Sequence, residues 1–129
     1  MRIFVVALLV LLTASPREHP GSDRHFELRR SVPEGYAAVD TVSEIRLWFT
    51  DRPAEGTTSI RVKDERDADV PTRGVVKDPR DDTSYSVALL RRLPPGRYTV
   101  LWEARALDGD RVDSYFPFQV TDAREERRR

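Results

Sequence analysis

The middle of the chain alternates between hydrophobic and polar positions. From residue 45 onward, Ile45, Leu47 and Phe49 occupy every second position. The same period of two recurs at residues 59–63, 84–89, 98–103 and 115–120. This period, together with many β-branched and aromatic residues, predicts strands that bury one face. No stretch shows ten residues of helical period, so we expect little helix.

Turn-forming residues separate the predicted strands. They are Pro33-Glu34-Gly35, Asp51-Arg52-Pro53, Pro94-Pro95-Gly96 and Asp108-Gly109. Pro95 and Gly96 suit the second and third positions of a type II turn, and Asp108-Gly109 predicts a tight turn. Several short antiparallel strands within about 100 residues predict an all-β fold, an immunoglobulin-like Greek-key β-sandwich or barrel of about seven strands. The residues expected in its single core are Ile45, Leu47, Phe49, Val87, Leu89, Tyr98, Val100, Trp102, Phe116 and Phe118.

Residues 1–14 have the pattern of an export signal. Residues 3–12 are all apolar. As a helix they would cover roughly 15 Å, against about 30 Å of bilayer hydrocarbon. This length fits the apolar part of a secretory signal peptide, and the small residues at 13–15 predict cleavage after Ala14. An uncleaved membrane anchor is the open alternative, and in both cases the rest of the chain is exported.

After the predicted signal peptide, the chain divides into a linker, one domain and a charged tail. Residues 15–24 are rich in Pro, Gly, Ser and charges and are predicted to be a linker. Residues 25–121 contain all the predicted strands and form one domain. Residues 122–129 are predicted to be a charged tail that is disordered or a frayed helix. We expect a monomer with no stable membrane insertion after signal cleavage.

Composition excludes several classes of function. The 129 residues contain no Cys, which excludes disulfides, zinc ribbons and thiol catalysis. Lys and Arg number 22 and Asp and Glu number 22, a balance that argues against nucleic-acid binding. Only two His are present, neither lies in a nucleophile motif, and no glycine-rich phosphate loop occurs. We therefore expect a binding protein and not an enzyme.

The strand anchors form an ordered set of motifs. In chain order they are His25-Phe26-Glu27-Leu28, Ser31-Val32-Pro33, Leu93-Pro94-Pro95-Gly96-Arg97-Tyr98-Thr99-Val100-Leu101-Trp102, Leu107-Asp108-Gly109-Asp110 and Phe116-Pro117-Phe118-Gln119-Val120. Over residues 25–120 this order resembles the CopC-type periplasmic copper-resistance domain. The resemblance implies a seven-stranded Greek-key sandwich or barrel, located in the periplasm or otherwise exported, that handles Cu(II).

The resemblance also implies a Cu(II) ligand set, which this sequence matches only in part. The family ligands are an N-terminal His and the Asp and His of Asp-Gly-His; they fall on His25, Asp108 and Asp110. Asp110 replaces the second His, and Cu(II) prefers imidazole nitrogen in tetragonal sites. His25 supplies an amine only if it is the first residue, and Arg24 before it is a poor cleavage site. We therefore expect Cu(II) binding to be weak or absent.

Three alternatives stay open beside the copper hypothesis. The first is a metal-free, immunoglobulin-like interaction module that docks a membrane or periplasmic protein, such as a membrane copper transporter. The second is a hard-cation site, for example for Ca²⁺, at Asp108, Asp110 and Asp113. The third is a flexible metal site in which His19 joins His25 and Asp110.

The two tryptophans have different expected roles. Trp102 shares the inward face of its strand and is expected in the core. Trp48 falls on the polar register and is a candidate for partner contact if exposed, or part of a small satellite cluster if the tail or linker covers it.

Overall fold

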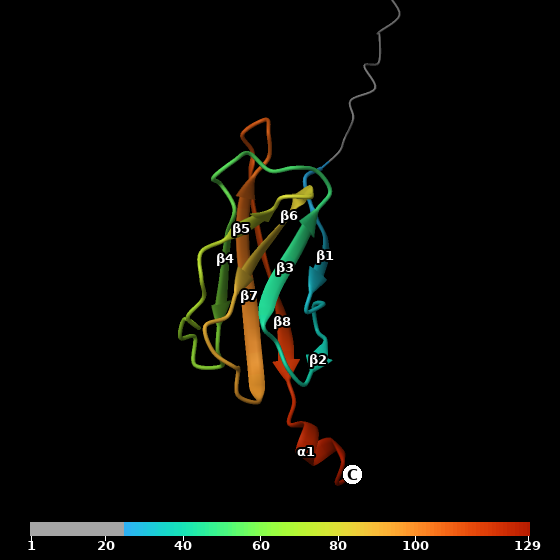
Figure 1. Ribbon diagram of the computed structural model, residues 1–129. Coiled ribbons are helices and arrows are strands. Elements are labelled where there is room, and N and C mark those ends of the chain that lie inside the picture. The colour runs from blue at the N-terminus through green and yellow to red at the C-terminus, as the bar shows by residue number, and fades with distance from the viewer. Residues whose placement is uncertain (1–24) are drawn as a thin grey trace, which may run out of the picture.

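The computed structural model describes residues 25–129 and shows two four-stranded sheets packed face to face (Figure 1). One sheet has the strand order β1-β3-β6-β5, and the other has the order β2-β8-β7-β4. The strands are β1 (Leu28–Val32), β2 (Ala38–Val39), β3 (Glu44–Phe49), β4 (Ser59–Lys63), β5 (Val76–Asp78), β6 (Asp81–Ala88), β7 (Gly96–Arg105) and β8 (Arg111–Val120). The predicted all-β sandwich is confirmed.

The period-two pattern places the core residues as predicted. In the antiparallel pair of β3 and β6, Ile45 lies opposite Val87 and Leu47 opposite Tyr85, and all four side chains are buried. The long strands β7 and β8 pair in the same way over their whole length. Every predicted core residue is buried except Leu89, which is partly buried and packs against the core.

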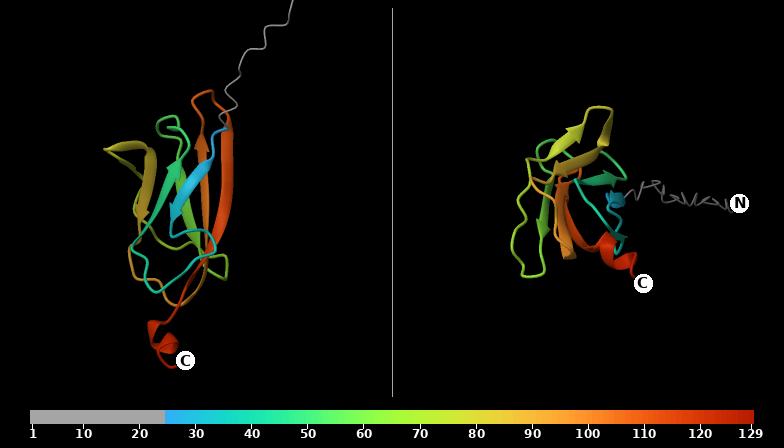
Figure 2. Two further views of the ribbon diagram at one scale, coloured as in Figure 1. Left: turned by 90° about the vertical axis from the view of Figure 1, so that its right-hand side faces the viewer. Right: turned by 60° about the horizontal axis from the view of Figure 1, so that its bottom comes forward.

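Two short strands are absent from the sequence prediction, which expected about seven. β2 pairs in parallel with the end of β8, and β5 pairs antiparallel with β6. β2 has two residues and β5 has three, and Val76 in β5 is 60% exposed, so neither segment shows a buried alternation. Between β1 and β2 the chain leaves the first sheet and joins the second, which places one edge of each sheet side by side (Figure 2).

The tight-turn prediction at Asp108-Gly109 is confirmed, and the type II prediction at Pro95-Gly96 is wrong. Gly109 has a φ of +95° and its N–H donates to the carbonyl of Ala106 at 2.9 Å. Gly96 has a φ of +154°, whereas that position of a type II turn requires about +80°. A Cβ on Gly96 would come within 3.3 Å of Glu65 Oε1, which accepts a hydrogen bond from the Arg97 N–H.

Of the segments outside the sandwich, the structure describes the C-terminal tail but not the N-terminal 24 residues. The predicted signal peptide, 1–14, and linker, 15–24, lie outside the described residues. In the predicted tail, 122–129, the structure has one short helix, α1 (Ala123–Glu126), capped by the Asp122 carboxylate. No helix within residues 25–129 is long and apolar enough to cross a membrane.

The centre of the core is an aromatic cluster around Phe49. Its ring lies 5.0 Å from that of Phe26, 5.3 Å from Trp102 and 6.3 Å from Tyr85, measured between centroids. Phe49 and Tyr85 belong to one sheet and Trp102 to the other. The Phe49 ring therefore contacts both layers and the segment that precedes β1.

Tyr98 closes the loop between β6 and β7. Its ring stacks on Phe118 with 5.6 Å between centroids, and its hydroxyl donates to the carbonyl of Pro94 at 2.7 Å. Burial raises the pKa of the Tyr98 hydroxyl above its ordinary value, and the nearby charges of Asp64 and Glu65 add to this effect. The folded state therefore favours the protonated phenol.

We predict that Phe49→Ala lowers the free energy of unfolding by about 3–5 kcal/mol, because it leaves a cavity between the two sheets. Urea unfolding followed by tryptophan fluorescence measures the change. The control is Tyr115→Ala, whose side chain is 70% exposed and whose loss we expect to change stability by less than about 0.5 kcal/mol. Equal effects of the two substitutions would contradict the central role of Phe49.

We also predict that the protein loses stability as the pH rises above about 10, the ordinary tyrosine value. The unfolded state releases the Tyr98 proton first, so stability is full below that pH and falls as the pH approaches the raised folded-state pKa. Tyr98→Phe should reduce this alkaline slope without removing it, because burial also raises the pKa of Tyr85. Urea unfolding at several pH values measures the slope, and Tyr115→Phe is the matched control. An unchanged slope in Tyr98→Phe would show that the prediction is wrong.

Candidate functional site

The residues predicted as metal ligands lie at one end of the sandwich. His25 precedes β1, and Asp108 and Asp110 lie in the turn between β7 and β8. Figures 1 and 2 show the start of β1 and this turn at the same end of the molecule. We call it the His25 end. The fold thus brings together two segments that are about eighty residues apart in the sequence.

The backbone fixes His25 and leaves its side chain exposed. The Thr50 hydroxyl donates to the His25 carbonyl at 3.1 Å and accepts from the Glu27 N–H at 2.9 Å. The Thr50 N–H donates to the Glu27 carbonyl at 2.9 Å. These bonds hold the backbone before β1 against the end of β3, and the His25 side chain is exposed at this end.

The turn between β7 and β8 uses Asp108 as an internal acceptor. Asp108 Oδ1 accepts from the Asp110 N–H at 3.0 Å, and the Ala106 N–H donates to the Asp110 carbonyl at 2.8 Å. The Arg105 guanidinium donates to the Gly109 carbonyl at 3.1 Å. The Asp110 side chain is exposed and takes no part in these bonds. The turn is therefore held by its backbone and by Asp108.

The structure does not gather the predicted ligands into a complete site. Within residues 25–129, no three or more His, Cys, Asp or Glu side chains lie close enough together to hold one metal ion. This finding covers the set of His25, Asp108 and Asp110 and the hard-cation set with Asp113. His19 lies outside the described residues. The assignment of these residues as ligands stays a prediction.

The sequence does not predict the ion pair between Lys77 and Glu55, which lies beside the turn between β7 and β8. Lys77 Nζ lies 2.7 Å from Glu55 Oε1, and the hydrogen bond from Lys77 lowers the pKa of the Glu55 carboxyl. The pair borders a hollow of about 240 Å³ that also includes Tyr85 and Leu107 from the turn. Glu55 lies in the loop between β3 and β4, and Lys77 lies in β5. Their spacing in the sequence therefore gives no signal of the contact. A carboxylate already engaged by Lys77 is a poor candidate for a metal ligand.

The Trp48 ring lies beside two arginines, and the linker that could also cover it lies outside the described residues. The Arg30 guanidinium lies 4.2 Å from the centroid of the Trp48 ring, and the Arg46 guanidinium lies 5.9 Å away. Arg46 also forms ion pairs with Glu44 at 3.2 Å and Asp78 at 3.0 Å. The ring is half-buried under these cations, which leaves little of it for partner contact. Trp102 is in the core, as predicted.

A family model and curated proteins both match this chain over the residues of the sandwich. The family model described as CopC domain matches residues 28–121. Protein YobA of Escherichia coli strain K12 is 25% identical over 115 residues, covering 88% of this chain and 91% of YobA. Protein YobA of Shigella flexneri matches with the same values.

Two solved structures share the fold. PcoC, a methionine-rich copper resistance protein from Escherichia coli, superposes with a TM-score of 0.67 at 24% identity, covering 75% of this chain and 99% of PcoC. CopC from Methylosinus trichosporium OB3b has a TM-score of 0.67 at 19% identity, covering 77% of this chain and 96% of that protein. Nearly the whole length of each structure is therefore represented here.

We predict that Asp108→Ala lowers the free energy of unfolding by about 0.5–1.5 kcal/mol, because the Asp110 N–H loses its acceptor. Asp108→Asn keeps a side-chain oxygen as acceptor, so its free energy of unfolding should fall by less than half as much as that of Asp108→Ala. Urea unfolding of the variants measures both changes. Asp113→Ala is the control, since its exposed carboxylate accepts no hydrogen bond among the described residues. A loss in Asp113→Ala as large as in Asp108→Ala would argue against the acceptor role.

Proposed function

Because the chain belongs to the CopC domain family, we propose that it is an exported copper-handling protein with a weakened Cu(II) site. The observation that carries the proposal is the family match over residues 28–121, which spans all eight strands. The proposal is also supported by the position of His25 and the turn of residues 106–110 at the same end of the sandwich. In this function the protein binds a metal ion as cargo and performs no catalysis.

The donor set fits Cu(II) poorly. Tetragonal Cu(II) favours imidazole nitrogen, and His25 is the one histidine in the described part of the chain. Asp108 already uses one carboxylate oxygen within the turn, and Asp110 offers only a carboxylate where the family pattern has an imidazole. Losing a metal ligand of this kind reduces affinity by at least about 10- to 100-fold. We therefore propose that Cu(II) binds weakly through His25.

A Cu(I) site has even less support. Soft Cu(I) prefers thioether and thiolate sulfur. PcoC is described as methionine-rich, whereas this chain has no Cys and its single methionine is Met1. If the predicted signal peptide is removed, the remaining chain has no sulfur ligand at all.

The second candidate function is that of a metal-free interaction module. The lack of a three-ligand cluster within residues 25–129 favours it. In this case the sandwich keeps its fold and docks another exported or membrane protein, with a membrane copper transporter as the proposed partner. The two candidates share the export prediction, which rests on the apolar residues 3–12 and the small residues that follow.

A competitive Cu(II) titration of the wild type and of Asp110→His distinguishes the two functions. We expect the wild type to bind one Cu(II) with a Kd weaker than about 1 µM. Asp110→His restores an imidazole at the position of the family histidine and should tighten binding at least about tenfold. Mass spectrometry of the same exported sample identifies the first residue and shows whether His25 supplies an amine.

Asp113→His is the matched control, because it adds an imidazole three residues away on the exposed part of β8. A gain in Asp110→His that exceeds the gain in Asp113→His supports a weakened copper site. Equal affinities of the two variants, with no wild-type binding above that of an unfolded sample, would favour the interaction module.

A further inference from the structure

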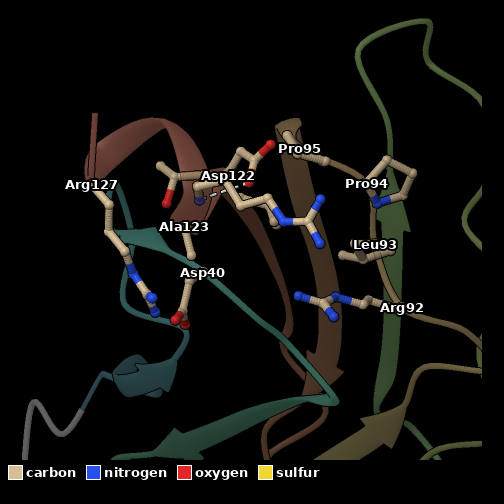
Figure 3. A pocket seen from close by; sticks show the side chains of 11 residues that line it. Asp40, Arg92, Leu93, Pro94, Pro95, Asp122, Ala123 and Arg127 are labelled. Carbon is tan, nitrogen blue, oxygen red and sulfur yellow. Dashed lines mark hydrogen bonds between the residues drawn. The ribbon is translucent and has the colours of Figure 1, made fainter. Parts of the chain in front are cut away.

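A second hollow lies at the end of the sandwich away from His25. Its volume is about 600 Å³, which is in the range of pockets that bind small molecules. It is bordered by the end of β2, the loop between β6 and β7, the end of β8 and helix α1 (Figure 3). We call it the α1 pocket. The proposed copper function does not involve this part of the molecule.

The floor of the α1 pocket is apolar and belongs to the core. Leu93 is 4% exposed and Val120 is 2% exposed, and both line the pocket. Pro94 and Pro95 form part of the wall. These residues are held by the closing hydrogen bond from Tyr98 to Pro94 and by the pairing of Val120 with β7. The floor is thus a fixed surface that excludes water from one side of a bound group.

The rim of the α1 pocket carries three arginines from two separate segments. Arg92 comes from the loop between β6 and β7, and Arg124 and Arg127 come from α1 and the residue that follows it. Figure 3 shows the Arg92 guanidinium directed into the hollow and Arg127 on the other side, pointing toward Asp40. None of the three lies within 4.0 Å of a carboxylate whose side chain the structure describes.

Of the two acidic residues on the rim, one caps α1 and the other faces Arg127 and not Arg92 (Figure 3). Asp122 accepts a hydrogen bond from the Arg124 N–H at 2.9 Å, so its carboxylate is engaged in capping α1. Asp40 is the other carboxylate on the rim. In the sequence, residues 90–95 contain two arginines and no acid, and residues 121–129 contain four arginines and three acids. In a chain with equal numbers of basic and acidic residues, these two segments therefore each carry a net positive charge.

Guanidinium groups on the rim of a pocket with an apolar floor favour one kind of ligand. The planar guanidinium fork binds phosphate through paired, charge-assisted hydrogen bonds. A phosphate ester has oxygens on several sides and can accept from guanidinium groups of both segments, Arg92 from the β6–β7 loop and Arg124 from α1. The apolar floor suits the carbon part of such an ester.

We propose that the α1 pocket binds the phosphate group of an organic phosphate ester, with Arg92 and Arg124 as the principal donors and Leu93 and Val120 beneath the ester's carbon atoms. Two sources share this chemistry: a soluble phosphate ester and the headgroup of an anionic phospholipid. Either ligand would bind independently of a metal at the His25 end.

The test is a titration of the full chain with glycerol 1-phosphate, followed by amide and arginine side-chain NMR shifts. We expect saturable shifts at residues 91–93 and 121–127. Arg92→Gln and Arg124→Gln should each weaken binding by about tenfold, the loss expected for a charge-assisted hydrogen-bond pair. Arg92→Lys keeps the charge but not the fork and should fall between the wild type and Arg92→Gln. Thermal unfolding of each variant establishes that it is folded.

Arg80→Gln is the matched control, since Arg80 is exposed in the turn between β5 and β6 and the substitution removes the same charge. Binding that weakens equally in Arg80→Gln and Arg92→Gln would mean general attraction to a cationic protein and would overturn the proposal. Absence of saturable binding of both glycerol 1-phosphate and vesicles would also overturn it.

Vesicle sedimentation separates the two sources. Vesicles of phosphatidylcholine with phosphatidylglycerol are compared with vesicles of phosphatidylcholine alone. Capture by the phosphatidylglycerol vesicles that Arg92→Gln abolishes and Arg80→Gln preserves supports the lipid headgroup as ligand. Binding of glycerol 1-phosphate without vesicle capture supports a soluble ester.

Discussion

The contact between Phe49 and Trp102 joins the two layers of this protein, and the remaining structure depends on it. The Phe49 ring comes from the end of β3 and Trp102 from the middle of β7, and their centroids are 5.3 Å apart. The chain has no disulfide, and no metal cluster lies within its described residues to hold the sheets together. Burial of apolar surface is therefore the main stabilising contribution. Phe26, which stacks on Phe49 at 5.0 Å, extends this cluster to the segment that carries His25.

The sequence predicts the part of the fold in which burial alternates. β3, β6, β7 and β8 have one face against the opposite sheet, so their hydrophobic residues follow the pleat of the strand. β2 and β5 were missed because they lie at sheet edges and are only two and three residues long. Gly96 was assigned to the wrong turn type because its neighbour Arg97 donates its N–H to a distant residue, Glu65, a contact that the local sequence does not reveal.

The candidate site could be predicted only as far as local motifs reach. Asp108-Gly109 signals a turn in the sequence, and the turn is found with Asp108 as its internal acceptor. Contacts between distant side chains leave no such signal. The ion pair of Lys77 with Glu55 and the covering of Trp48 by Arg30 depend on which loops the sandwich brings together. The α1 pocket was missed for the same reason, because Arg92 and Arg124 come from segments about thirty residues apart.

The fold of this protein is physically separable from the side chains predicted to bind a metal. Asp110, at the position where the family resemblance implies a histidine, has an exposed side chain that makes none of the bonds holding its turn. The core residues do not contact that position through any described hydrogen bond, and the sandwich matches the family along its whole length. An exposed side chain at the His25 end can therefore change at little cost in stability. The same argument applies to the α1 pocket, whose arginines are exposed while its floor is part of the core. In both places the stable interior holds the backbone in position, and the exposed side chains at each end are free to determine what is bound.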